Sequence, residues 1–159
     1  MRRAHKIDYE FHCISKAVVE TCIRNGIGNV VIGHNKNWKQ FSDMGKKSNQ
    51  KFVQIPFNDL IWKIRYKAEE AGIKVFETEE SYTSKTDHCA GEEMCHHEKY
   101  LGRRTRRGLF KSSTGKVLNA DINGAIGMLR KENALRDADL VGLLDRGDVV
   151  SPRVLRYKP

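Results

Sequence analysis

The chain contains few prolines and few aromatic side chains, and it has no long apolar run. Among its 159 residues there are 3 prolines, and Phe, Trp and Tyr together make up 8%. Without a long apolar run, no membrane-spanning helix is expected. Residues 1–11 are basic but include no apolar core, so no signal peptide is expected either. The length predicts one domain or part of one.

Cysteine is scarce, and the four thiols fall in two unlike contexts. Cys13 and Cys22 lie in an amphipathic segment and are expected to be buried. Cys89 and Cys95 lie close together in the sequence, with histidines beside them. This pattern is not that of a small disulfide-bonded secreted protein, so a reducing, cytoplasmic compartment is expected.

Acidic residues are outnumbered, with 20 Asp and Glu against 29 Lys and Arg, which gives a net charge of +9. Such an excess favours a polyanionic partner, and nucleic acid is the leading candidate. A solvated basic surface is the alternative. One run contains six basic residues and no acidic one: Lys99, Arg103, Arg104, Arg106, Arg107 and Lys111. Because arginine forks match phosphate oxygens, this run predicts contact with a nucleic-acid backbone without base specificity.

Helix and strand patterns alternate along the first half of the chain. Apolar residues recur every three or four positions over residues 7–25, which predicts a helix that ends at Gly26. The β-branched run over 29–33 predicts a strand, and a polar loop follows. A second helix is expected from Pro56 to Gly72, before a strand over 73–78. This order predicts an α/β fold with helices packed on a sheet.

The second half changes character at residue 86. Residues 86–107 are rich in His, Cys, Gly and Arg and predict an inserted loop or small module. The stretch that follows predicts two short strands around a turn at Thr114 and Gly115. A last helix is expected from near Asp121, and an extended, peripheral tail after Asn133.

Six stretches together resemble one family: "VVIGHNKNWKQ", "NQKFVQIPF", "YKAEEAGIKV", "EESYTSKT", "RRGLF" and "NADINGA". In this order they are similar to the C-terminal half of TnpB (OrfB) proteins. These are RNA-guided DNA endonucleases of insertion sequences, often called transposases, and relatives of the single-effector type V CRISPR nucleases. The similarity covers roughly residues 5–131, and its specificity lies in the order and spacing of the motifs.

The resemblance implies a partial RuvC-like, RNase H-like α/β domain with an inserted, zinc-ribbon-like nucleic-acid-binding module. Residues 1–85 would form the C-terminal portion of the RuvC-like domain and residues 86–107 the insertion. Residues 108–132 would supply the last RuvC-like strands and helix, and residues 133–159 a peripheral tail. The family's first catalytic Asp, on an opening strand, has no counterpart here, because Asp8 lies in a helical stripe. The isolated chain is therefore expected to be inactive.

The resemblance also implies catalysis with Mg²⁺ held by carboxylates. Asp121 in "NADINGA" matches the family's last catalytic Asp, and the alternative for an Asp at a helix start is an N-terminal cap. Where the family carries its middle Glu, this chain has Gly33, His34 and Asn35. We expect Glu79 or Glu80, at the end of the strand over 73–78, to replace it.

Only one of these two glutamates is expected to face the metals, because successive strand residues point to opposite sides. Glu80 is favoured, since it adjoins the Ser-Tyr-Thr-Ser motif. The alternative is a solvated pair that ends the strand.

A structural zinc ion would need four nitrogen or sulfur ligands. The candidates are Cys89, Cys95, His88 and His96, with His97 nearby. The family's ribbon often uses two Cys-x-x-Cys pairs, and the spacing here is irregular. A degenerate loop without zinc is therefore favoured over a zinc site.

Three functions follow from these patterns. The first is a truncated or split RNA-guided DNA endonuclease whose partners are DNA, a guide RNA and a second polypeptide that supplies the N-terminal strands. The second is a non-catalytic nucleic-acid-binding relic or regulator of an insertion sequence. The third is a transposase acting in strand transfer, against which the similarity to guide-dependent nucleases argues.

Overall fold

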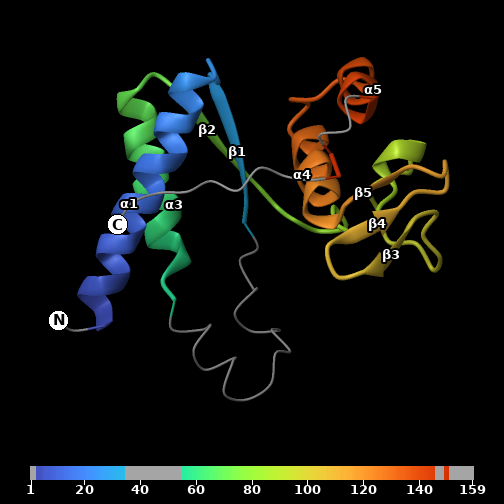
Figure 1. Cartoon of the computed structure of the whole chain (residues 1–159), viewed down its shortest axis with the longest axis horizontal. Coiled ribbons are helices and arrows are strands. Elements are labelled where there is room, and N and C mark those ends of the chain that lie inside the picture. The colour runs from blue at the N-terminus through green and yellow to red at the C-terminus, as the bar shows by residue number, and fades with distance from the viewer. Residues whose placement is uncertain (1–2, 35–54, 146–148, 151–159) are drawn as a thin grey trace. The chain divides into compact units, whose positions relative to one another are not determined.

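A computed structural model of the chain describes residues 3–34, 55–145 and 149–150. The elements, in chain order, are α1 (Arg3–Arg24), β1 (Asn29–Gly33), α3 (Phe57–Glu70), β2 (Lys74–Thr78), the short 3₁₀ helix η1 (His88–Ala90), β3 (Arg103–Arg106), β4 (Leu109–Lys111), β5 (Val117–Asn119), α4 (Ala120–Lys131) and α5 (Asp137–Asp145) (Figure 1). They form a mixed α/β structure with small sheets, as the alternation predicted. Most of the predicted polar loop lies at 35–54, outside the described residues.

The chain divides into two compact units. Among the described residues, the first comprises 3–32 and 55–76, and the second comprises 33–34, 77–145 and 149–150. Among the described residues, no helix is both long and apolar enough to cross a bilayer.

In the first unit, α1 and α3 lie side by side (Figure 1). Their shared core consists of buried Val19, Cys22, Ala68 and Ile73, with Val18, Val30 and Val75 packed against it. Strand β1 pairs with β2. The backbone N–H of Lys74 donates to Gly28 at 2.9 Å and that of His34 to Thr78 at 2.7 Å, and both bonds fit one parallel register.

Both helices of this unit end two residues before the glycines that the sequence indicated. Gly26 and Gly72 adopt φ of 64° and 74°. After α3, the N–H of Ile73 donates to Ala68 at 2.8 Å and the N–H of Gly72 donates to Glu69 at 2.9 Å. This pair of bonds satisfies the last carbonyl groups of the helix and reverses the chain toward the following strand.

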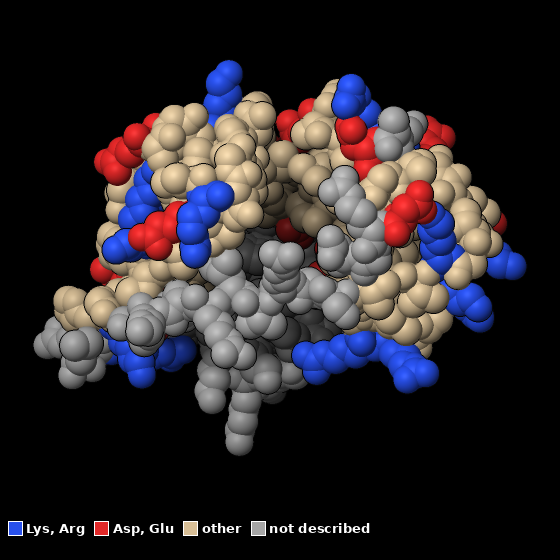
Figure 2. Space-filling model, turned by 45° about the horizontal axis from the view of Figure 1, so that its top comes forward, with Lys and Arg blue, Asp and Glu red and all other residues tan. Residues whose placement is uncertain are grey.

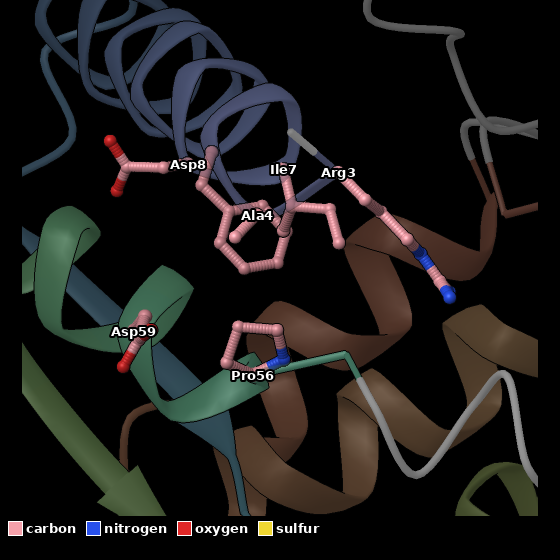
Figure 3. A pocket seen from close by; sticks show the side chains of 7 residues that line it. Arg3, Ala4, Ile7, Asp8, Pro56 and Asp59 are labelled. Atoms are coloured by element: carbon pink, nitrogen blue, oxygen red, sulfur yellow. The ribbon is translucent and has the colours of Figure 1, made fainter. Parts of the chain in front are cut away.

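The first unit also holds a cavity of about 490 Å³ between the first turns of α1 and α3. It is lined by Arg3, Ala4, Ile7, Asp8, Phe11, Pro56 and Asp59 (Figure 3). Oδ1 of Asp8 forms an ion pair at 2.8 Å with Nζ of Lys63, whose side chain is 8% exposed. This hydrogen bond is the largest cause that holds the pKa of Asp8 below its usual value. Asp8 is therefore the counter-ion of a buried lysine.

The second unit is built on the antiparallel sheet β3-β4-β5. Strands β4 and β5 form the predicted hairpin, in which Gly115 takes φ 85° and the N–H of Ser112 donates to Lys116 at 2.9 Å. Phe110 and Leu118 of this hairpin are buried against Ile126 of α4. Strand β3 was not predicted, because its sequence "RRTR" is exposed at every position and lacks an apolar alternation.

The region after Asn133 corrects the expectation of a peripheral tail. Its described part contains α5, and Leu140 and Val149 are 5% and 6% exposed in the core around Phe110. The backbone N–H of Asn119 donates to Val149 at 2.8 Å. The physical reason is the burial of apolar surface. The short sheet and α4 alone would leave apolar side chains exposed to water, and the leucines of α5 cover them.

Candidate metal and nucleic-acid site

Glu80 and Asp121 line one cavity of about 560 Å³ in the second unit. The turn after β2 supplies Glu80, and the first turn of α4 supplies Asp121. The full lining is Glu80, Thr83, Ser84, Lys85, Tyr100, Gly102, Arg103, Arg104, Phe110, Ala120, Asp121, Gly124 and Met128. Two carboxylates and three cationic side chains therefore share this cavity.

Asp121 does not cap its helix. The side-chain oxygen of Asn119 accepts from the N–H groups of Asp121 and Ile122 at 2.8 and 3.2 Å, so Asn119 is the cap. The Asp121 side chain is 87% exposed and lies 3.7 Å from the guanidinium of Arg104. Its carboxylate is thus directed to an ion pair at the cavity rather than to the helix backbone.

The two adjacent glutamates lie in different surroundings. Glu80 lines the cavity, and a Cβ on Gly33 would collide with its carboxylate and with the sulfur of Met128. Glycine at position 33 therefore permits the close approach of β1 to Glu80. Glu79 accepts a hydrogen bond from the hydroxyl of Ser81 at 2.6 Å and is not among the lining residues. Which glutamate binds metal remains a prediction, but only Glu80 shares the cavity with Asp121.

The turn that follows Glu80 is fastened to α4 by Asn123. This side chain is fully buried, and its amide donates to the carbonyl groups of Thr86 at 3.0 Å and Ser84 at 3.5 Å. Within the described part of the chain its Oδ1 has no hydrogen-bond partner. Asn123 thereby fixes the turn that carries Lys85. Sequence reasoning missed both residues, although each lies inside a motif that it had selected.

Two buried carboxylates organise the insertion. The carboxylate of Asp87 accepts from the Ser113 N–H at 2.7 Å and from the hydroxyls of Ser112 and Ser113 at 2.9 Å each. Burial alone would raise the pKa of Asp87, but these hydrogen bonds outweigh it and hold the pKa below its usual value. Glu92 accepts from the N–H groups of Asp87 at 2.6 Å and Leu101 at 2.8 Å. The Asp87 contacts tie the start of the insertion to the β4–β5 turn, and the Glu92 contacts link Asp87 to Leu101 within the insertion.

The predicted zinc ligand His88 is 1% exposed and fully engaged. Its Nε2–H donates to the Thr83 carbonyl at 2.8 Å, and its Nδ1 accepts from Arg130 at 3.5 Å. Burial is the largest cause that lowers the pKa of this imidazole.

The other zinc candidates each contact different groups. Cys89 packs against the core, and burial raises the pKa of its thiol. The sulfur of Cys95 lies 3.3 Å from Nε2 of His97, and His96 stacks edge-on with Tyr82. Over the described residues, which include the whole insertion, no three His, Cys, Asp or Glu side chains form a metal-binding group.

The basic run is largely strand β3 and its flanks. Arg103 pairs in register with Lys111, and Arg104 with Phe110. Arg103 and Arg104 line the cavity with Lys85, whereas the other members of the run do not. All residues of β3 are exposed, and Figure 2 shows basic side chains projecting from the described surface beside acidic ones.

Glu80 and Asp121 bring two carboxylates to the lining of one cavity. Magnesium prefers carboxylates, keeps several waters and is commonly completed by substrate phosphates. The three-carboxylate set of a two-metal site is not present among the described residues. The cavity therefore combines two carboxylates, the ligand type that Mg²⁺ prefers, with three cationic side chains that suit phosphate.

Comparison with known proteins places this cavity in a family context. Residues 57–128 match the family described as Cas12f1-like, TNB domain. This stretch runs from α3 into α4 and includes every residue of the cavity lining. The match thus begins in the first unit and covers the second unit as far as Met128.

Two relatives and one solved structure extend the match. The chain is 33% identical over 116 residues to the CRISPR-associated endodeoxyribonuclease Cas12f1 of Sulfoacidibacillus thermotolerans, which covers 72% of the chain and 24% of that protein. It is 29% identical over 118 residues to the TnpB-like protein ORF457 of Acidianus two-tailed virus, which covers 74% of the chain and 23% of that protein. The cryo-EM structure of a Cas12f1–sgRNA–target DNA complex matches with a TM-score of 0.58 and 19% identity, over 79% of this chain and 34% of that one.

The chain is a distant TnpB- and Cas12f1-like protein with a TNB domain, which confirms the resemblance seen in the sequence. It spans about a quarter of the length of the curated relatives that it matches.

Proposed function

We propose that this chain is part of a truncated or split RNA-guided DNA endonuclease that cleaves DNA by a RuvC-type mechanism when its missing strands are supplied. In this proposal, residues 1–85 and 108–132 belong to the RuvC-like domain and residues 86–107 form its nucleic-acid-binding insertion. The observation that carries the proposal is the cavity in which Glu80 and Asp121 meet Lys85, Arg103 and Arg104.

Each group in the cavity has a role that its chemistry suits. Asp121 and Glu80 would hold Mg²⁺, which would supply Lewis-acid polarisation of a phosphodiester and lower the pKa of a bound water. Lys85, Arg103 and Arg104 bind and orient the phosphates of a DNA strand. Asn123 acts on the turn that carries Lys85 and is a positioning residue.

Completion by a second polypeptide is supported by the β1–β2 sheet. Among the described residues, strands β1 and β2 form a two-stranded parallel sheet. Parallel sheets are normally larger and covered on both faces, and an unpaired edge is a template for another strand. An added strand would also bring the family's first catalytic Asp, which the carboxylate count requires.

The test is a Mg²⁺-dependent cleavage assay with a guide RNA and a matching DNA target. The purified chain alone should not cut. Adding a polypeptide that carries the opening RuvC strands should produce cleavage, and Asp121→Ala should abolish it, whereas Glu79→Gln should retain it if Glu80 is the ligand. Cleavage by the chain alone that disappears in Asp121→Ala would show that it supplies its own third carboxylate.

A non-catalytic nucleic-acid-binding protein is the second candidate. The observation that favours it is the ion pair of Asp121 with Arg104, which leaves the cavity with more positive than negative side chains. Under this alternative, the completed sheet would bind DNA or RNA but would not cut in the same assay.

A further inference from the structure

We propose that Arg104 couples the binding of nucleic-acid phosphate to the binding of a divalent cation. In the free protein, Arg104 is the counter-ion of Asp121, and a bound phosphate takes Arg104 away and leaves Asp121 to the cation. This inference rests on the proposed function, because it uses Asp121 as a metal ligand. It adds a role that neither the fold nor the relatives assign to Arg104.

The geometry shows a loose pair. Nη2 of Arg104 lies 3.7 Å from Oδ1 of Asp121, which exceeds the usual N–H···O separation of about 2.7–3.2 Å. The two side chains are 59% and 87% exposed. Ion pairs this exposed are weak, since water and salt screen them. The pair can therefore be exchanged at little cost.

The sheet register explains why Arg104 reaches this cavity. Arg104 stands opposite Phe110 in the β3–β4 ladder, directly before an irregularity between Arg104 and Arg106. Residues directly opposite in an antiparallel pair point to the same face. Phe110 is 2% exposed and lines the cavity. The side chain of Arg104 thus extends from the face of the sheet that borders the cavity, where the first turn of α4 carries Asp121.

A phosphate is a better partner for Arg104 than Asp121 is in this geometry. Guanidinium binds phosphate through two parallel N–H···O bonds, and these charge-assisted bonds are short. Lys85 and Arg103 line the same cavity and would hold the same anion. Once Arg104 has turned to the phosphate, Asp121 lacks a counter-charge, and a divalent cation near Glu80 and the phosphate supplies one.

The coupling must be reciprocal and modest. If phosphate raises the affinity for the cation, the cation raises the affinity for phosphate by the same factor. Because exposed pairs are worth up to about 1 kcal/mol, the factor is about two- to fivefold.

The decisive experiment is a Mn²⁺ titration of the folded chain without nucleic acid, followed by electron paramagnetic resonance, with Mn²⁺ as the probe for Mg²⁺. Arg104→Gln removes the competitor and should bind Mn²⁺ about two- to fivefold more tightly than the parent chain. Arg103→Gln removes an equal charge from the same cavity but not from the ion pair with Asp121, and it should produce a smaller rise. Lys116→Gln, which loses a partner of Asp145 instead, controls for net charge. Asp121→Asn should lose the bound Mn²⁺.

The outcomes separate the inference from the proposed function. Equal affinities in Arg104→Gln and the parent chain, with loss in Asp121→Asn, would overturn the coupling and keep the metal site. An equal rise in Mn²⁺ affinity in Arg103→Gln would also overturn the coupling, because the rise would then reflect the loss of any positive charge from the cavity. No Asp121-dependent Mn²⁺ binding in any variant would overturn the metal site itself.

A second measurement tests reciprocity. The affinity for a single-stranded oligonucleotide is compared with and without Mg²⁺ at constant ionic strength, in the parent chain and in Arg104→Gln. The ratio of the two affinities should be larger in the parent chain. Equal ratios would contradict the exchange even if the Mn²⁺ titration agreed with it.

Discussion

The carboxylate of Asp87 accepts a hydrogen bond from the backbone N–H of Ser113 at 2.7 Å, across a separation of 26 residues. The insertion and the β4–β5 turn are therefore joined by a buried anion. Asp87→Asn keeps the size of the side chain but loses acceptor capacity and charge where three donors converge. We expect it to lower the free energy of unfolding by about 2–4 kcal/mol in urea denaturation.

Asp145→Asn is the matched control, because Asp145 is exposed and forms an ion pair at 3.1 Å with the exposed Lys116. It should change stability by less than about 1 kcal/mol. The pKa of Asp87 is depressed by folding, so its contribution is complete above the ordinary value of 3.8 and is lost as pH falls through the lower folded value. Similar losses of unfolding free energy in Asp87→Asn and Asp145→Asn would show that the buried hydrogen bonds of Asp87 do not stabilise the second unit.

His88 predicts a second pH dependence at milder acidity. Its pKa is lowered from 6.5 by folding, so below that pH the unfolded chain binds more protons than the folded one. Stability should therefore fall as pH decreases below 6.5. His88→Gln should reduce this slope in urea denaturation curves collected between pH 7.5 and 5. An unchanged slope would place the proton uptake on another group.

The basic strand predicts the salt dependence of nucleic-acid binding. Replacing Arg103, Arg104, Arg106 and Arg107 with Ala should reduce the slope of log affinity against log salt by up to about 0.9 per arginine that contacts a phosphate of duplex DNA. Fluorescence anisotropy with two unrelated sequences measures this. The control replaces four exposed basic residues of the first unit, Lys6, Lys16, Arg24 and Lys74. Equal slopes in the two quadruple variants would assign the effect to net charge.

Zinc content should be well below one ion per chain. The imidazole Nε2 of His88 is committed to the Thr83 carbonyl, and burial favours the protonated thiol of Cys89 over the thiolate that zinc requires. Elemental analysis of protein purified in metal-free buffer measures the content. One zinc per chain that disappears in Cys89→Ala would contradict this prediction.

The sequence predicted those elements whose signals are local. Gly26 and Gly72 end helices because glycine adopts positive φ without strain, and the Thr114–Gly115 turn closes a hairpin for the same reason. Strand β3 escaped prediction because its side chains are all solvated, so burial leaves no pattern in the sequence. Helix α5 was not predicted because its leucines are buried only by the core of the second unit, which lies elsewhere in the sequence.

The site residues also divide into those with a local signal in the sequence and those whose role depends on distant parts of the chain. Motif position selected Asp121 and Glu80, but only the fold brings them to one cavity with Arg104. The buried roles of Asp87 and Glu92 were not foreseen, because acidic residues in a loop are ordinarily solvated. Their importance depends on donors that lie far along the chain.

The contact between Gly33 and Glu80 has a consequence for substitution. The carboxylate of Glu80 fills the volume into which a side chain at position 33 would project. Position 33 at the end of β1 and position 80 in the turn after β2 thus compete for one space, which the sulfur of Met128 also borders. A carboxylate at position 80 requires that position 33 contribute only a hydrogen atom. Relocation of a carboxylate from one of these positions to the other therefore requires paired changes, since acidic side chains at both would clash.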